Sequence, residues 1–284
     1  MMNTSLRLSG IDSVVLGVYR AVADAAGILR IRWVIIGATA RDLIYEKAFR
    51  ITPRRRTQDV DLAIEVENWG RYEQLRMELI RNGAFRSCER EYQRLRCQAT
   101  GLAIDVIPFG GVEHDQAITW PSEFAIRMST LGLADALGTA IRVVLAGDPD
   151  LEVPVVHPGV LVAMKLFAWV DRPDRDKDAG DAAFMISQYG KIFANDDRLF
   201  SEHADLLHAV DFDLDAAYAE LLGRDLASLL TSTCRHELQM LVGAQAELGD
   251  DSRLVADMAR QSSLSVEQCR NQVAALKRGL HETQ

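Results

Sequence analysis

Cysteine is scarce in this chain, and its few copies are not spaced for metal binding. The four cysteines, Cys88, Cys97, Cys234 and Cys269, contain no C-x-x-C pair, so we expect no zinc site built from them. Reduced thiols in a cytoplasmic protein are the simplest interpretation. The six histidines are scattered as well. His203 and His208 do not have the i, i+4 spacing of a helical zinc site.

Long apolar runs are also missing. The N-terminal MMNTSLRLSGID has no apolar core of the signal-peptide kind, and no window reaches the ~18 apolar residues of a membrane span. We therefore expect no membrane association and a cytoplasmic location. The 284 residues are 48% hydrophobic and 26% charged, a balance typical of a globular protein with a sizeable core.

Positive charge is in deficit, because the formal net charge is −9. This argues against non-specific binding to long nucleic acids, which requires many cations to neutralise phosphates. The arginines are nevertheless clustered locally. Two groups could meet RNA phosphates, namely Arg54, Arg55 and Arg56, and then Arg90, Arg94 and Arg96.

The hydrophobic pattern predicts an α/β part followed by a helical part. After Pro158 the pattern becomes helical to the end of the chain, and Pro173 is the last proline, which sets the expected domains at residues 1–158 and 159–284. The fold class we expect is a mixed sheet with flanking helices, followed by a helical domain. Strands are predicted over residues 32–36, 58–66, 94–98, 102–108, 117–120 and 153–156. Helices are predicted over residues 13–28, 39–45, 69–81, 133–145, 160–169, 178–189, 204–210, 214–222, 226–229, 235–246 and 266–280.

Two aspartates one residue apart, Asp59 and Asp61, lie in the predicted strand 58–66. Alternate strand residues face the same side, ~6.6 Å apart along the chain, and two carboxylates so placed resist joint ionisation unless a cation neutralises them. Hard oxygen ligands suit Mg²⁺, and paired ions assist phosphoryl displacement. The plainer alternative is a solvated strand face, because D-x-D is a short and common pattern.

Asp105 interrupts the apolar run LAIDVIPF. Burying a carboxylate there is costly unless it is paired or bound to a metal ion. If its strand neighbours that of Asp59, the three carboxylates converge, and Asp105 can bind a second ion or accept a proton from an attacking hydroxyl. An edge strand with Asp105 facing water remains the alternative.

Two further features fit a triphosphate site. Gly37, Ala38 and Thr39 form a strand-to-helix turn, where a glycine allows close approach of the backbone and amides at the helix start face an anion; a plain turn is the alternative. Lys165 is the one charged residue in an apolar helix, and it either extends to the surface or reaches into a cleft. Asp178 and Asp181 share a helix face, and a solvated helix start would explain them equally.

In combination, four stretches resemble the nucleotidyltransferase superfamily typified by DNA polymerase β, and more finely the AbiEii/AbiGii-type toxin family, which includes the MenT toxins. They are VIIGATARDLIYE, RRTQDVDLAIEV, IDVIPFGGV and LVAMKLFAWVDRPDRDKDAGD, within residues 33–189. The turn departs from the common Gly-Ser pattern at Ala38, where Thr39 could supply the hydroxyl. The gap from Gly37 to Asp59 is also longer than in compact members.

The resemblance implies a role for each matching residue. Asp59, Asp61 and Asp105 would bind two Mg²⁺ ions, with Mn²⁺ as an alternative, and Lys165 would join them as a catalytic residue. The triphosphate would be bound by Gly37, Ala38, Thr39, Arg41, Lys165, Lys177, Asp178 and Asp181. The implied reaction transfers a nucleoside monophosphate from an NTP to an acceptor hydroxyl, with the tRNA 3′ end as the expected acceptor and an antitoxin protein as a partner.

Three competing interpretations stay open at this stage. A nucleotidyltransferase that modifies an antibiotic would use the same triad, and an acidic cleft would suit a cationic drug. A non-catalytic module could keep the fold and bind nucleotide or a partner. Finally, the aspartates could be surface charge on an unrelated α/β domain.

Overall fold

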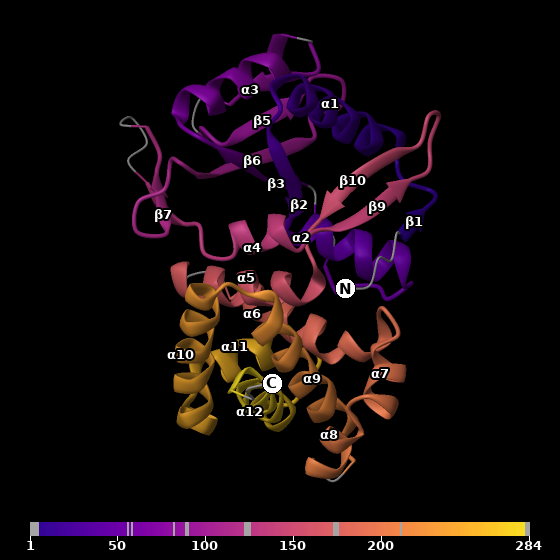
Figure 1. Cartoon of the computed structure of the whole chain (residues 1–284), viewed down its shortest axis with the longest axis vertical. Helices are drawn as coiled ribbons and strands as arrows, with labels where there is room; N and C mark the ends of the chain where they lie inside the picture. The colour runs from indigo at the N-terminus through magenta and orange to yellow at the C-terminus, as the bar shows by residue number, and fades with distance from the viewer. Residues whose placement is uncertain are drawn as a thin grey trace. The chain divides into compact units, whose positions relative to one another are not determined.

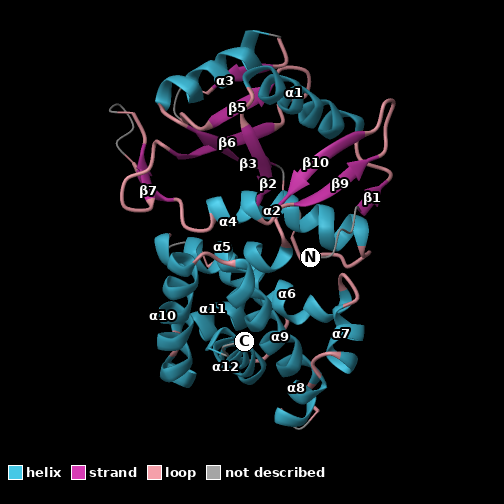
Figure 2. Cartoon of the chain, in the orientation of Figure 1, coloured by secondary structure: helices cyan, strands magenta, loops and turns pink. Residues whose placement is uncertain are grey.

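The chain folds into two compact units, Met1–His157 and Pro158–Gln284. The computed structural model describes residues 6–55, 57, 59–81, 83–88, 91–121, 126–172, 176–210 and 212–281. The first unit combines a mixed sheet with helices, and the second is helical throughout its described part (Figure 2). The expected class, a mixed α/β fold followed by helices, is confirmed.

A mixed sheet forms the framework of the first unit. Among the described residues it has eight strands in the order β1-β9-β10-β2-β3-β6-β5-β4. Their bounds are β1 Leu6–Leu8, β2 Arg32–Ile36, β3 Asp59–Val66, β4 Phe85–Ser87, β5 Arg94–Cys97, β6 Ala103–Gly110, β9 Ile141–Leu145 and β10 Leu151–Val155. A separate hairpin pairs β7 (Ala117–Thr119) with β8 (Arg127–Ser129).

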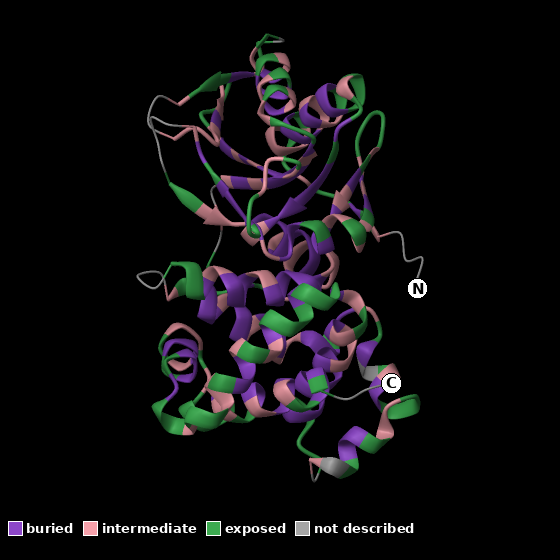
Figure 3. Cartoon of the chain, turned by 60° about the vertical axis from the view of Figure 1, so that its left-hand side comes forward, coloured by how far each residue is buried: buried purple, intermediate pink, exposed green. Residues whose placement is uncertain are grey.

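Most residues in the middle of the sheet are apolar and buried, and they are coloured purple in Figure 3. Strands β2 and β3 carry branched residues such as Ile35, Leu62 and Ile64, all without exposed surface. Helices α1 (Ser13–Leu29) and α3 (Trp69–Arg81) pack together along the sheet (Figure 1), and α4 (Leu133–Gly138) contacts β2, β3 and β6. Burial of these branched side chains against the helices stabilises the sheet that carries the site.

Two strand pairings decide where the acidic residues lie. Strand β3 runs antiparallel to β2 and parallel to β6, with Asp61 opposite Ile36 on one side and Asp105 on the other. Strand β5 then pairs antiparallel with β6 and places Arg94 opposite Asp105. Residues far apart in sequence thus meet at one end of β3.

A tight turn at Gly37 joins β2 to the short helix α2 (Gly37–Arg41). This helix continues as a π-helix over Asp42–Ala48, a wider form that is uncommon and often marks functional sites. The basic linker that follows returns the chain to β3. The sequence predicted the helix but not its change of winding.

The second unit, called the helical unit below, contains α5 Pro158–Asp171, α6 Lys177–Ser187, α7 Asn195–Ser201, α8 Ala204–Ala209, α9 Leu214–Leu229, α10 Ser232–Leu248, α11 Arg253–Gln261 and α12 Val266–His281. Its packing centres on α9 and α12, which cross where Gly223 meets Gly279. A side chain at Gly279 would lie 2.0 Å from the carbonyl oxygen of Glu220. The two glycines therefore permit the close approach of the helices.

Two predicted elements are wrong. The helix predicted over residues 133–145 ends at Gly138, and Ile141–Leu145 is instead strand β9, paired with β1 and β10. The predicted break between residues 222 and 226 does not exist, because α9 runs through Gly223. Among the described helices, none has the length and apolar composition needed to cross a membrane.

Candidate metal and nucleotide site

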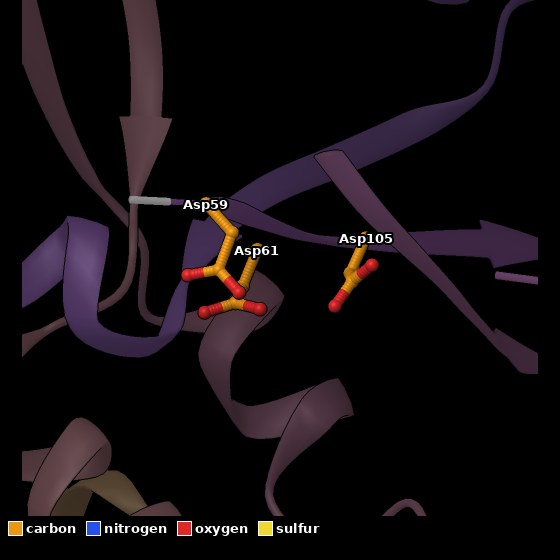
Figure 4. Close-up of side chains that lie close together, drawn as sticks. All are labelled: Asp59, Asp61 and Asp105. Atoms are coloured by element: carbon orange, nitrogen blue, oxygen red, sulfur yellow. The ribbon is translucent and has the colours of Figure 1, made fainter. Parts of the chain in front are cut away.

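The three predicted aspartates come together at the end of β3. One carboxylate oxygen from each of Asp59, Asp61 and Asp105 lies within 4.8 Å of the other two. Figure 4 shows the first two projecting from β3 and the third from β6, with all three directed to the same side. The parallel pairing of Asp61 with Asp105 produces this convergence.

Gly37 makes room for one of these carboxylates. Its φ angle is +67°, in the left-handed region, and a Cβ atom there would lie 2.0 Å from Oδ2 of Asp61. Only a residue without a side chain allows the turn and the carboxylate to share this space. The glycine predicted for triphosphate binding therefore also sets the position of Asp61.

Two threonines hold the backbone and side chain of Asp59. Thr39 donates a hydrogen bond of 2.7 Å from its hydroxyl to the carbonyl oxygen of Asp59. The hydroxyl of Thr57 donates to Asp59 Oδ1 at 2.6 Å. Thr39 was predicted to supply a hydroxyl to the nucleotide, and in the structure this hydroxyl donates its hydrogen bond to the backbone of β3. Thr57 was missed, although its position two residues before the pair is a usable signal.

A partly buried ion pair of Arg41 with Asp42 lies next to Thr57. The guanidinium of Arg41 donates to Asp42 Oδ1 from Nε at 2.9 Å and from Nη2 at 2.7 Å, and it also reaches the carbonyl of Arg55. Burial raises the pKa of Asp42, while Arg41 and the Thr57 amide partly offset that effect. Arg41, predicted to bind nucleotide, is 2% exposed and anchors the basic linker through these contacts.

Arg94 binds the third aspartate from the neighbouring strand. Its Nε and Nη2 donate to the two oxygens of Asp105, each at 2.7 Å, and Nη2 lies 3.5 Å from Asp59 Oδ2. The hydrogen bonds with Asp105 raise the pKa of Arg94, so the guanidinium is charged at any ordinary pH. Arg94 was predicted as an RNA contact, but the structure places its side chain in the triad.

The remaining predicted RNA contacts lie nearby or outside the described residues. Arg54 and Arg55 are exposed in the linker before β3. Arg96 is on β5 and donates to the carbonyl of Gly101. Arg56 and Arg90 fall outside the described part of the chain. An RNA role for these arginines stays a prediction.

The predicted residues of the helical unit form a cluster of their own. Lys165 on α5 lies 2.8 Å from both Asp178 Oδ1 and Asp181 Oδ2 on α6. Burial lowers the pKa of Lys165, but the two carboxylates outweigh it and the net shift is upward. Lys177 is exposed at the start of α6. The lysine neither extends to the surface nor lies unpaired, and its contact with nucleotide stays a prediction, as do those of Ala38 and Lys177.

The residues of the triad fit a hard divalent cation. All donors are carboxylate oxygens, the ligand type that Mg²⁺ and Mn²⁺ prefer, and the space beside Asp61 exists because Gly37 lacks a side chain. Three carboxylates this close also repel one another without a cation. Asp59, Asp61 and Asp105 would supply the protein ligands and leave other coordination positions for phosphate oxygens.

Comparison with known proteins gives limited likeness. No protein-family model matches the chain, and no curated protein matches its sequence. Among solved structures, the antibiotic-resistance factor ANT(2″)-Ia aligns with 71% of this chain and 99% of its own, at 15% identity and a TM-score of 0.37. The Thermotoga maritima CCA-adding enzyme complexed with tRNA aligns with 95% of this chain and 81% of its own, at 12% identity and a TM-score of 0.26.

Proposed function

We propose that the chain is a metal-dependent nucleotidyltransferase. The observation that carries this proposal is the convergence of Asp59, Asp61 and Asp105 within 4.8 Å, beside a glycine turn that leads into a helix. Mg²⁺ bound there would neutralise charge that develops on the phosphate oxygens during transfer. The surface-charge alternative does not account for three carboxylates gathered from two strands.

The proposed reaction is an in-line displacement at the α-phosphorus of an NTP. An acceptor oxygen forms a bond to that phosphorus, the bond to the bridging oxygen breaks, and pyrophosphate leaves. Asp59 and Asp61 would supply carboxylate ligands to the cation, and Asp105 would take the hydroxyl proton. We infer that the Gly37 turn contacts the β- and γ-phosphates.

The acceptor that we propose is the 3′ end of a tRNA. The support is the resemblance of four sequence stretches to the AbiEii/AbiGii-type family, together with the exposed Arg54 and Arg55. By the same resemblance, the protein would act as a growth-arresting toxin that a partner antitoxin neutralises. The net charge of −9 restricts RNA binding to such local basic surfaces.

Incubation of total RNA with each of the four NTPs, labelled at the α-phosphate, tests this proposal in the presence of Mg²⁺. We expect label on RNA of tRNA size with at least one NTP, and none with Asp61→Asn. Asp24→Asn is the matched control, because Asp24 is an exposed acid on α1 of the same unit. Failure of all four NTPs to label RNA would overturn the tRNA acceptor, and equal labelling by the Asp61 variant would overturn the site.

A further inference from the structure

Arg94 contacts three acidic side chains, those of Asp105, Asp59 and Glu91. Two of its nitrogens bind both oxygens of Asp105, and one of these also lies 3.5 Å from Asp59. The third, Nη1, lies 2.8 Å from Glu91. Its side chain is 20% exposed and that of Asp105 is 13% exposed, so solvent screens this cluster only in part.

The sheet itself fixes this arrangement. Arg94 and Asp105 are cross-strand neighbours on β5 and β6, and a bidentate guanidinium–carboxylate pair has a preferred planar geometry. Glu91 holds the far side of the guanidinium, three residues earlier in the chain. The positive charge is therefore positioned by backbone pairing and not by chance contact of a long side chain.

We propose that Arg94 is a built-in counter-cation of the triad, and that a divalent ion must compete with it for Asp105 and Asp59. This inference rests on the proposed metal-dependent function. Three converging carboxylates need positive charge for the fold to tolerate them. Arg94 supplies that charge from within the chain, and its hydrogen bonds occupy oxygens that a cation would otherwise bind.

The competition has two opposite effects. Arg94 stabilises the metal-free fold, because it compensates the acids. It also weakens the binding of a lone metal ion, because that ion meets a site with one positive charge already in it. Metal would then bind most favourably together with the negatively charged triphosphate, which would make occupancy of the site depend on the nucleotide.

Titration of Mn²⁺ alone by calorimetry, using the full chain, tests the inference. We expect Arg94→Gln to bind Mn²⁺ about tenfold more tightly than the wild type, the size of a partly buried ion-pair effect. Arg94→Lys keeps the charge but cannot form the planar fork, so its affinity should lie between the two. Arg96→Gln is the matched control: it removes the same charge two residues along β5, where the partner is the Gly101 carbonyl, and should change the affinity by less than about twofold.

Thermal unfolding gives a second readout that does not depend on activity. Without metal, Arg94→Gln should unfold at a lower temperature than Arg96→Gln, and saturating Mn²⁺ should raise its Tm more than it raises that of the wild type. Equal or weaker Mn²⁺ binding by Arg94→Gln would overturn the inference, because Arg94 would then organise the site instead of competing for it.

Asp61→Asn separates failure of this inference from failure of the proposed function. If Asp61→Asn weakens Mn²⁺ binding but Arg94→Gln does not strengthen it, only the role of Arg94 is wrong. If Asp61→Asn binds Mn²⁺ as tightly as the wild type, the metal site itself is wrong, and the inference falls with it.

Discussion

Replacement of Gly37 by alanine should change two properties of the protein, its free energy of unfolding and its affinity for a metal ion. The new Cβ atom would lie 2.0 Å from Asp61 Oδ2 and 2.7 Å from Asp61 Cγ, whereas real Cβ atoms essentially never approach below 3.0 Å. The carboxylate must therefore move by at least about 1 Å, several times the ~0.2 Å tolerance of a metal–ligand distance. The left-handed φ of +67° adds a cost of ~1–2 kcal/mol for an L-residue.

Gly83→Ala provides the matched comparison. Gly83 also has a left-handed φ, +76°, but a Cβ atom there meets nothing within 4 Å. Both variants should lose ~1–2 kcal/mol of unfolding free energy from backbone strain. Only Gly37→Ala should also weaken Mn²⁺ binding, by at least about tenfold, because it displaces a ligand.

Chemical denaturation and calorimetric titration of Mn²⁺ measure the two effects on the same samples. Mn²⁺ affinity in Gly37→Ala equal to that in Gly83→Ala would refute the reasoning. It would mean that Asp61 does not bind the metal ion, or that it can do so from a displaced position.

Three further predictions concern neighbouring groups. Thr57→Val should weaken Mn²⁺ binding severalfold, since it removes the hydrogen bond to Asp59, and Thr57→Ser should restore it; equal affinities in titration would contradict this. Lys165→Met should lower the free energy of unfolding by ~3–5 kcal/mol, because it removes the cation 2.8 Å from the buried Asp178 and the partly buried Asp181 and leaves Asp178 with the longer 3.8 Å contact to Arg172. Adding Asp178→Asn and Asp181→Asn should recover most of the loss, and no recovery in denaturant melts would argue against the pairing. The pKa of Lys165 is raised in the folded state, so its contribution to stability is present in full below its ordinary pKa of 10.5 and is lost as the pH rises through the folded pKa. Denaturant melts from pH 10.5 upward should therefore show a decline in stability that Lys165→Met lacks.

Cysteine reactivity checks the packing of the helical unit. Burial raises the pKa of Cys269 to about 11, whereas Cys88 and Cys97 are partly exposed. At pH 8 a thiol reagent should modify Cys88 and Cys97 first, and Cys269 only after unfolding. Rapid modification of Cys269 in the native protein, located by mass spectrometry, would show that α12 is not packed as described.

The sequence predicted the elements that carry the triad because their signals are local. Alternation of polar and apolar residues defines β3, and one acid in an apolar run defines β6. The convergence of the three aspartates also requires the parallel pairing of β3 with β6, which sets Asp61 beside Asp105. This pairing is non-local, so the sequence offered it only as a condition. The bidentate hydrogen bonds from Arg94 to Asp105 depend on a third strand, β5. They have no local signal, so in the sequence Arg94 is only one arginine of a basic stretch.

The failed predictions also have physical causes. Residues 141–145 lie next to a true helix and share its apolar character, and only pairing with β1 and β10 makes them a strand. The predicted helices end at residue 222 and begin again at residue 226, and the gap between them starts with Gly223, a residue of low helix propensity. In the structure its lack of a side chain is used for contact with α12, a tertiary effect that outweighs propensity.

The most direct test of the central claim compares label at the α- and γ-phosphates of the same NTP. With Mg²⁺ and total RNA, the wild type should transfer the α-label to RNA and release the γ-label in pyrophosphate. Transfer should fall by at least about a hundredfold in each of three variants, Asp59→Asn, Asp61→Asn and Asp105→Asn. Transfer of the γ-label, or undiminished transfer of the α-label by all three variants, would contradict the account.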